Sequence, residues 1–256
     1  MVDRVDKKEE AIRGVLRSTS EQDAARELVE EFAKSRDGLA VRLQNFTRYT
    51  RRQDLTRLLV RYELFKRVLN VKGSIVECGV YHGFGLMAWL NLSAVLEPVN
   101  MTRRIYGFDT FAGFPEPRPQ DNGNGATHAA GELRSDSKAE LTRLIALHDK
   151  NRFLGHVPKV QLIEGDATTT IPLFVKQNQH VVVSMLFLDF DLYEPTKVAI
   201  ETFLPRMPKG AIIAFDELDN PRWPGETLAI LDAAGLAKLR LQRFEFDPYV
   251  AFAEIE

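Results

Sequence analysis

The chain has 256 residues, a formal net charge of −2, 45% hydrophobic residues and 27% charged residues. This length and apolar content suit one large α/β domain, or such a domain with a helical attachment. The near-neutral charge gives no general attraction to nucleic acid or to anionic membranes. The single cysteine, Cys78, excludes an internal disulfide. A charged N-terminus and the lack of a membrane-length apolar run complete the expectation of a soluble cytoplasmic protein.

Residues 1–70 are expected to form a helical extension that covers a cofactor or contacts another subunit. The first part has apolar side chains at helical spacing. Between Arg42 and Arg67 there are eight Lys or Arg residues against two acids. This basic segment is either a core-packed helix with a solvated face, or an entrance where Arg51 or Arg52 meets an anionic ligand.

Residues 71–256 alternate between strand and helix patterns, which predicts a doubly wound, mostly parallel sheet of the Rossmann-like α/β class. The expected strands are Ser74–Cys78, Ile105–Asp109, Val160–Glu164, Val181–Asp189 and Ala211–Asp216. The expected helices are Gly85–Leu96, Ser137–His148, Thr170–Gln177, Thr196–Phe203 and Gly225–Ala234. Two further runs, Leu239–Phe246 and Val250–Ile255, predict a terminal antiparallel strand pair.

A long segment rich in Pro, Gly, Asn and Asp, from Thr110 to Gly131, interrupts this alternation. Its composition is too irregular for regular secondary structure. Loops of this length in compact domains are usually lids or binding loops, and are otherwise disordered.

Acidic residues stand at or next to the ends of the predicted parallel strands. Glu77 is one residue from the end of the first strand, and Asp109, Asp189 and Asp216 end three others. Asp166 closely follows the remaining strand. Ligands of doubly wound sheets bind beyond the carboxyl ends of the strands, and acids are rarely buried without partners. We therefore expect a ligand site on this rim of the sheet.

The turn after the first strand contains Gly79 and Gly83, which let a backbone turn sharply and let a ligand approach it closely. It does not match the dinucleotide fingerprint, because Tyr81 and Phe84 occupy the second and third glycine positions. The chain also has no Gly-Lys-Ser/Thr sequence of a P-loop. A pyrophosphate site is therefore disfavoured.

The acids at the strand ends suit the groups of S-adenosylmethionine. Glu77 would face a cationic part of the ligand, Asp109 the ribose hydroxyls and Asp166 the adenine amino group. The alternatives are a loop or helix cap for Asp109, and an ion pair between Glu77 and an arginine of residues 51–61. The candidate cofactor-binding residues are Glu77, Gly79, Tyr81, Gly83, Asp109, Thr110, Phe111, Asp166, Ala167 and Asp189.

A second acidic group follows the fourth and fifth strands. Asp189 and Asp191 are two residues apart and point the same way on an extended chain, and Asp216 is followed by Glu217. Carboxylates without nitrogen or sulfur ligands suit a hard cation such as Mg²⁺. For Asp191 the alternative is an N-terminal helix cap. His128, in the long loop, is a candidate base, although a lone histidine is more often structural or solvent-exposed.

Three segments in order, Glu77–Gly83, Gly107–Pro115 and Leu188–Thr196, resemble the macrocin O-methyltransferase family. The resemblance covers about residues 45–230. It implies a class I S-adenosylmethionine-dependent enzyme that methylates sugar hydroxyls in antibiotic and related glycoside pathways. The family's Val-Asp-Asp-Tyr motif is Phe-Asp-Glu-Leu in this chain, from residue 215 to 218. Residues 49–53 are similar to the branch acting on nucleotide-linked deoxyhexoses, such as TDP-sugar 3-O-methyltransferases.

The resemblance implies that a sugar hydroxyl displaces the sulfonium methyl group in line. A divalent ion held by Asp189, Asp216 and Glu217 would lower the hydroxyl pKa, and Asp191 or His128 would take the proton. The expected partners are a small sugar substrate, for example a TDP-sugar, and further copies of the chain in a homo-oligomer.

Three other functions remain open. A catechol or another small phenol is the alternative acceptor, since metal-assisted methylation serves these as well. A nucleic-acid-binding module or RNA methyltransferase would use the basic segment, but the overall charge and the lack of an aromatic strand platform argue against it. A regulator that binds S-adenosylmethionine without turnover would leave the carboxylates with no purpose.

Overall fold

The computed structural model describes residues 18–256 in two compact units, divided between Arg57 and Leu58. Helix expected before residue 18 lies outside the described residues. In the N-terminal unit a capping box starts the first helix: the Ser18 hydroxyl accepts the Glu21 N–H, and the Glu21 carboxylate accepts the Ser18 N–H. The elements of this unit are α2 (Thr19–Lys34), α3 (Leu39–Gln44), the 3-10 helix η1 (Phe46–Arg48) and the start of α4 (Arg52–Val68).

The second part of α4 belongs to the sheet unit. Val60, Leu64, Phe65 and Val68 are buried and pack with Ile75 of the first strand. These apolar residues recur at helical spacing, which places one face of the helix against the sheet. The compact sheet unit therefore begins at Leu58, earlier in the chain than the boundary after residue 70 suggested by the sequence pattern.

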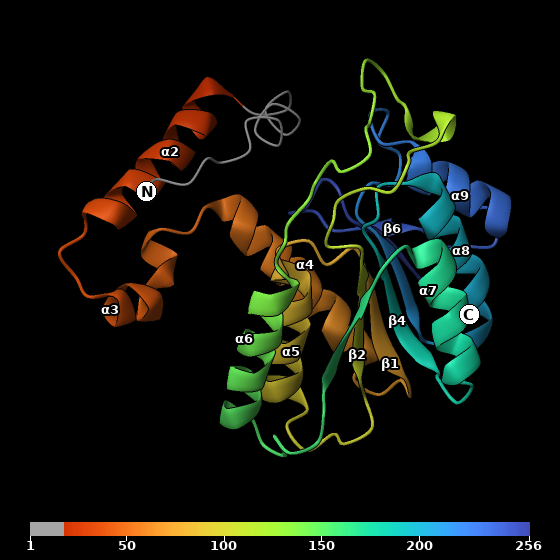
Figure 1. Ribbon diagram of the computed structural model, residues 1–256, viewed down its shortest axis with the longest axis horizontal. Helices are drawn as coiled ribbons and strands as arrows, with labels where there is room; N and C mark the ends of the chain where they lie inside the picture. The colour runs from red at the N-terminus through yellow and green to blue at the C-terminus, as the bar shows by residue number, and fades with distance from the viewer. Residues whose placement is uncertain (1–17) are drawn as a thin grey trace. The chain divides into compact units, whose positions relative to one another are not determined.

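Within residues 18–256, seven strands form one sheet in the order β3-β2-β1-β4-β5-β7-β6. Figure 1 labels β1, β2, β4 and β6 of this sheet. The first five strands are parallel, whereas β7 runs antiparallel to β5 and to β6. This confirms the predicted mostly parallel sheet with a terminal antiparallel pair. The strands are β1 (Ser74–Cys78), β2 (Ile105–Asp109), β3 (Val160–Glu164), β4 (Val183–Leu188), β5 (Ile212–Phe215), β6 (Gln242–Arg243) and β7 (Ala251–Glu254).

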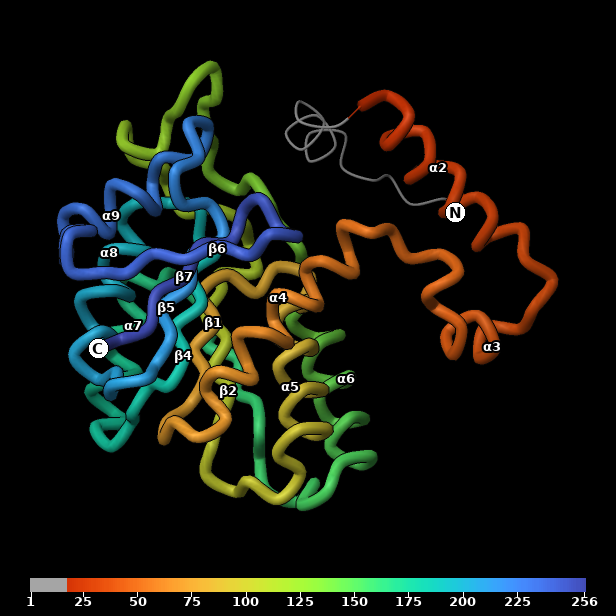
Figure 2. The backbone as a smooth tube through the Cα atoms, turned by 180° about the vertical axis from the view of Figure 1, so that it is seen from behind, coloured from red at the N-terminus to blue at the C-terminus, as the bar shows by residue number. Residues whose placement is uncertain are grey.

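Helices cover both faces of the sheet (Figures 1 and 2). One core cluster joins α4, α5 (Phe84–Leu96) and α6 (Lys138–Asn151) to one face of the strands. The other joins α7 (Ala167–Gln177), α8 (Tyr193–Phe203) and α9 (Gly225–Ala233) to the opposite face. β1, β4 and β5 are buried along their whole length because both faces are covered, which explains their uninterrupted apolar sequences.

Two helices begin three residues earlier than the sequence predicts. Helix α7 begins at Ala167 because the Asp166 carboxylate accepts the Thr168 N–H at 2.9 Å and caps it. Helix α8 begins at Tyr193 and includes Pro195 in its first turn. Proline is tolerated there because its missing N–H would have no helical acceptor.

A buried charged cluster closes the end of the sheet opposite the predicted site. Arg103 donates to Glu97 at 3.0 Å and to the Val68 carbonyl at 2.8 Å. Lys159 donates to the Asn100 carbonyl at 3.0 Å, and its Nζ lies 3.8 Å from Glu97 Oε1. Burial lowers the pKa of Lys159 to about 8, although the neighbouring Glu97 carboxylate opposes the shift.

The pKa of Lys159 predicts a pH-dependent stability. Above pH 8 the folded protein releases this proton while the unfolded chain keeps it up to about pH 10.4, so this lysine makes stability rise with pH between these values. Replacing Lys159 with Met removes the rise. From pH 7 to 10 we expect urea unfolding to show wild type gaining about 2 kcal/mol relative to the variant. Lys66→Met, at an exposed residue, serves as the control. If the stability of Lys159→Met changed with pH in the same way as that of wild type, the prediction would be contradicted.

Candidate active site

The parallel strands end level with one another at the predicted rim. Cys78 pairs with Phe108 of β2 and with Leu188 of β4, and Leu188 pairs with Phe215 of β5. The residues that follow these positions, Gly79, Asp109, Asp189 and Asp216, therefore emerge at the same edge of the sheet. They flank the point between β1 and β4 where the strand order reverses, which is where doubly wound sheets bind ligands.

The turn after β1 is closely packed against the end of β4. Gly79 has φ +94°, and a Cβ at this position would lie 1.9 Å from the Asp189 carbonyl oxygen. Only glycine satisfies both the left-handed backbone and this approach. Gly83, the N-cap of α5, has φ +85°, and a Cβ there would lie 2.2 Å from the Leu141 side chain.

Asp109 binds the backbone of two turns. Its Oδ2 accepts the N–H groups of Val80 and Tyr81 at 2.8 and 2.7 Å, and its Oδ1 accepts the Phe111 N–H at 2.6 Å. Asp109 thus makes the backbone hydrogen bonds of a loop cap, which is the alternative to a cofactor contact. A carboxylate has about four acceptor positions, so three N–H bonds leave room for one more donor.

A buried arginine lies beside Glu77. Arg61 of α4 is 1% exposed; its Nη2 lies 3.8 Å from Glu77 Oε1 and 4.0 Å from Asp189 Oδ2. Its guanidinium also lies over the Phe187 ring, 4.5 Å from the centroid. A Cβ at Gly85 would lie 1.7 Å from Glu77 Oε1, so the start of α5 approaches this pair closely. The partner in the proposed ion pair of Glu77 is therefore Arg61. The sequence alone did not distinguish Arg61 from the other cations of the basic segment.

Four non-glycine residues near the strand ends have left-handed backbone conformations: Tyr81 after β1, Phe111 after β2, Asp191 after β4 and Asp219 after β5. Their φ values are +51°, +54°, +62° and +64°. Such conformations cost about 1–3 kcal/mol each and cluster at functional sites. Asp tolerates this conformation better than most residues, whereas nothing in the local sequence reveals it for Tyr81 and Phe111.

The structure places Leu192, and not Asp191, at the N-cap position of α8, and the Leu192 side chain makes no capping bond. Instead Asp121, from the long loop, accepts the Tyr193 N–H at 2.6 Å through Oδ1. The long loop also contains a short 3-10 helix, η2 (Pro119–Asp121), contrary to the expected absence of regular structure. Asp121 was missed because it lies far from α8 in the sequence.

A second buried acid lies behind the Asp216-Glu217 pair. Glu226 of α9 is 0% exposed, and its Oε2 accepts the Glu217 N–H at 3.0 Å. Burial raises the pKa of Glu226 well above its usual range, and the negative charges of Asp191, Asp216 and Glu217 raise it further. Within residues 18–256, however, no three His, Cys, Asp or Glu side chains are placed so that they could hold a metal ion.

His128 lies inside an aromatic contact. Its ring stacks on Trp223 with centroids 3.8 Å apart and planes at 17°, and its side chain is 2% exposed. Nδ1 lies 3.6 Å from Glu132 Oε2, and Nε2 lies 3.5 Å from the Arg222 carbonyl. The long loop is thereby packed on the segment that follows β5.

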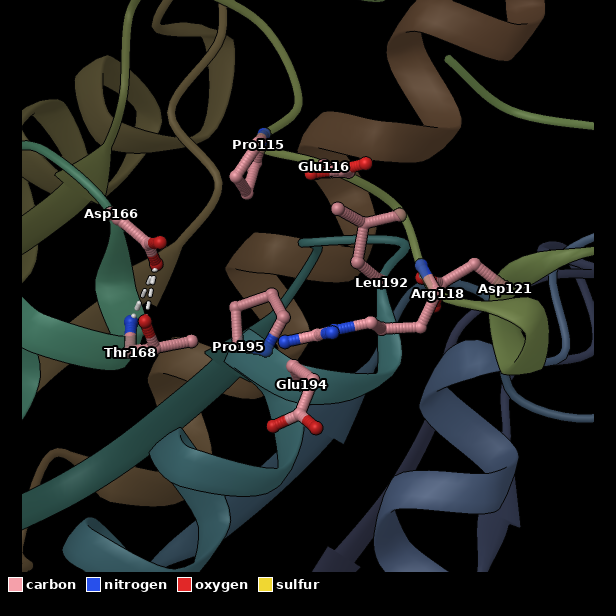
Figure 3. Close-up of a pocket in the computed structure, with 9 residues that line it drawn as sticks. All are labelled: Pro115, Glu116, Arg118, Asp121, Asp166, Thr168, Leu192, Glu194 and Pro195. Atoms are coloured by element: carbon pink, nitrogen blue, oxygen red, sulfur yellow. Dashed lines mark hydrogen bonds between the residues drawn. The ribbon is translucent and has the colours of Figure 1, made fainter. Parts of the chain in front are cut away.

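A cavity of about 240 Å³ lies between the long loop and the starts of α7 and α8 (Figure 3). Asp166 Oδ1 accepts both the N–H and the hydroxyl of Thr168, at 2.9 and 2.7 Å. With four carboxyl groups and one arginine, the cavity suits neutral or cationic groups better than anions. Its lining residues are Pro115, Glu116, Arg118, Asp121, Asp166, Thr168, Leu192, Glu194 and Pro195.

The arginines expected at an anion entrance have partners within the N-terminal unit. Arg51 donates twice to Asp54, at 2.8 Å each, and Arg52 pairs with Glu21.

None of the helices in the described part of the chain is both long and apolar enough to cross a membrane.

The strand order, the glycine turn and the row of acids at the switch point define the class I methyltransferase fold. Solved structures agree. A structure of CalS11, a calicheamicin methyltransferase, has 36% identity and a TM-score of 0.89 over 93% of each chain. An apo structure of CalS11, described as a TDP-rhamnose 3'-O-methyltransferase, has 34% identity and a TM-score of 0.81 over 93% of this chain and 95% of that one. The O-methyltransferase NovP, at 18% identity, 77% and 78% coverage and TM-score 0.56, shows the fold alone.

Residues 13–232 match the Macrocin-O-methyltransferase (TylF) family, and the chain belongs to that family. A relative from Streptomyces olivaceus, 8-demethyl-8-(2,3-dimethoxy-alpha-L-rhamnosyl)-tetracenomycin-C 4'-O-methyltransferase, is 28% identical over 161 residues. That match spans 58% of this chain and about half, 54%, of the relative.

Proposed function

We propose that this protein transfers the methyl group of S-adenosylmethionine to a hydroxyl of a nucleotide-linked deoxyhexose. The observation that carries the proposal is the rim itself, where the Gly79 turn, Asp109 and Asp189 meet at the switch point of a sheet that aligns with CalS11 over 93% of the chain. The relatives support a sugar acceptor, since one is described as acting on TDP-rhamnose and another on a rhamnosyl group.

For the cofactor, we place adenine in the cavity beside Asp166 and the ribose at Asp109. Asp166 uses Oδ1 for its bonds to Thr168, so Oδ2 is the oxygen proposed to accept from the adenine amino group. Asp109 has room for one ribose hydroxyl rather than for the pair first expected. The methionine part would lie along the turn from Gly79 to Gly83, above the buried Glu77.

The proposed reaction is an in-line displacement. The sugar oxygen forms a bond to the methyl carbon, the carbon–sulfur bond breaks, and S-adenosylhomocysteine leaves. Asp191 is the first candidate for the base that takes the hydroxyl proton, because it follows β4 at the rim, two residues beyond Asp189. His128 is the second candidate, and it would have to act from within its stack on Trp223.

A divalent ion is a separate part of the proposal. Asp189, Asp216 and Glu217 offer oxygen ligands, as Mg²⁺ prefers, although within residues 18–256 no three such side chains are gathered into a metal site. Burial is the main cause of the raised pKa of Glu226, and the negative charges of Asp191, Asp216 and Glu217 add to it; a dication would offset these charges. When bound, such an ion would lower the pKa of the hydroxyl and orient it.

Two binding measurements and an acceptor screen test the proposed class. Calorimetry should show binding of S-adenosylmethionine and of S-adenosylhomocysteine, and no binding at millimolar cofactor would exclude a methyltransferase. Nucleotide-linked deoxyhexoses, free glycosides and catechols are then compared as acceptors by mass spectrometry. A gain of one methyl group on the nucleotide sugar is the expected result. Methylation of catechols alone would show that the acceptor is a phenol and not a sugar.

The metal is tested on its own. We expect exhaustive chelation to lower kcat at least about 10²-fold, with recovery on adding Mg²⁺, and Asp189→Asn to abolish Mg²⁺ binding measured by calorimetry. The exposed Asp136, which pairs with Arg134, provides the control variant Asp136→Asn. Activity that survives both chelation and Asp189→Ala would exclude the metal role even if the enzyme class is right.

We also propose that the N-terminal unit mediates a homo-oligomer. Neither α2 nor α3 buries a residue, although this unit carries large apolar side chains on its surface. Large exposed apolar surface is typical of contact surfaces. Sedimentation should give a mass above that of one chain, and a monomer at micromolar concentration would argue against it. The exposed residues are Val29, Phe32, Leu39, Val41, Leu43 and Phe46.

A further inference from the structure

The long loop contains one buried acid to which the proposed chemistry gives no role. Asp121 is 1% exposed, whereas its neighbours Pro119, Gln120 and Asn122 are exposed. A buried carboxylate is costly unless hydrogen bonds compensate for its lost hydration. Its partners therefore indicate why an acid is placed here.

Asp121 bridges the loop and the start of α8. Oδ1 accepts the Tyr193 N–H at 2.6 Å, and Oδ2 accepts the Arg118 N–H at 2.6 Å. The first N–H groups of a helix have no acceptor within the helix, and a negative charge is favoured at this end. Because Leu192 offers no capping side chain, the cap of α8 comes from a distant loop.

Three segments meet at this carboxylate. A Cβ at Gly225, the first residue of α9, would lie 2.5 Å from the Asp191 carbonyl oxygen, 2.7 Å from the Tyr193 nitrogen and 3.0 Å from Asp121 Oδ1. Asp191 itself has φ +62°, a conformation that persists only where neighbouring groups hold it. Asp121 is thus one of the groups that define the backbone from Asp191 to Tyr193.

The same loop reaches both halves of the proposed site. Asp121 and Arg118 line the cavity that also contains Asp166 (Figure 3). A few residues later, the Asn124 N–H donates to the Pro221 carbonyl at 2.8 Å, and His128 stacks on Trp223. The residues that line the cavity and the residues that contact the segment after β5 therefore belong to one short stretch of the long loop.

We propose that Asp121 is a positioning residue for methyl transfer. Through the Tyr193 N–H it holds the backbone that carries Asp191, so that the Asp191 carboxylate is directed at the acceptor hydroxyl. It acts through its neighbours and does not touch the reacting atoms. This inference rests on the proposed function, and in particular on Asp191 as the base.

The test compares Asp121→Ala and Asp121→Asn with Asp247→Ala. Asp247 is a matched control because it is also buried and accepts two backbone N–H groups, from Tyr249 and Val250 at 2.9 Å each, in the turn before β7. We expect Asp121→Ala to lower kcat about 10²-fold with a smaller change in acceptor KM. Asp121→Asn keeps the acceptor for Tyr193 and should recover about 10-fold of this loss. Asp247→Ala should lower stability and leave kcat unchanged.

A double-mutant cycle separates positioning from general loss of structure. In an Asp191→Asn background, Asp121→Ala should lower kcat less than about threefold further, because the group it positions is already gone. Hydrogen exchange should show faster exchange in residues 191–197 for Asp121→Ala and not for Asp247→Ala. Additive losses in the cycle, equal kcat losses at 121 and 247, or unchanged exchange would overturn the inference. A wild-type protein that methylates no acceptor would instead remove the proposed function, and the exchange comparison would still decide whether Asp121 holds the backbone.

Discussion

Replacing Arg61 with methionine is expected to lower the free energy of unfolding by about 3–5 kcal/mol. Arg61 is the cation beside Glu77, which is itself 1% exposed, and it lies 4.0 Å from Asp189. Methionine retains much of the apolar contact with Phe187 and removes the charge. Removing one member of a buried pair takes the counterion from the other, and a loss of this size is a large part of the stability of an ordinary domain. Urea unfolding followed by circular dichroism measures it.

The second half of this experiment identifies the cause. Arg61→Met combined with Glu77→Gln should recover most of the lost stability, because the buried negative charge that lost its arginine is then gone as well. Arg67→Met on the same helix is the control, since Arg67 is exposed and lies over the Phe252 ring at 4.8 Å; it should cost less than about 1 kcal/mol. If the double variant is as unstable as Arg61→Met, the pairing with Glu77 is not what stabilises this region.

Replacing Gly79 with alanine should abolish cofactor binding. The new Cβ would lie 1.9 Å from the Asp189 carbonyl oxygen and 2.7 Å from its carbon, both backbone atoms. The ends of β1 and β4 would have to separate at the switch point, and the left-handed conformation at Gly79 adds about 1–2 kcal/mol. We expect S-adenosylmethionine affinity to fall more than about 10²-fold by calorimetry, together with a clear loss of thermal stability.

Gly235→Ala separates the steric clash at Gly79 from the cost of its left-handed backbone conformation. Gly235 has φ +72°, and a Cβ there would have no atom within 4 Å, so only the backbone cost of about 1–2 kcal/mol applies. Its cofactor affinity should equal that of wild type. A Gly79→Ala variant that binds cofactor normally would show that the ends of β1 and β4 can separate without loss of affinity. It would count against placing the methionine part along this turn.

Much of the fold was predictable from local pattern. The apolar runs of β1, β4 and β5 indicated strands covered on both faces, and the spacing of strands and helices indicated a parallel sheet. The acids at the strand ends followed directly, because strands that run parallel end at one edge. Helix starts were less predictable: Asp166 caps α7 and a distant loop caps α8, and only the first of these is adjacent in sequence.

Local pattern was enough to predict the class of fold, the rim that carries Asp109, Asp189 and Asp216, and the family resemblance that the match over residues 13–232 confirms. These follow from periodicity and from short motifs, which depend on neighbouring residues. Which groups meet across the chain is seen in the folded molecule alone. There Arg61 pairs with Glu77, and Asp121 binds the first turn of α8. Both depend on burial and long-range contacts, since a charge or a carboxylate acquires its role from what surrounds it after folding.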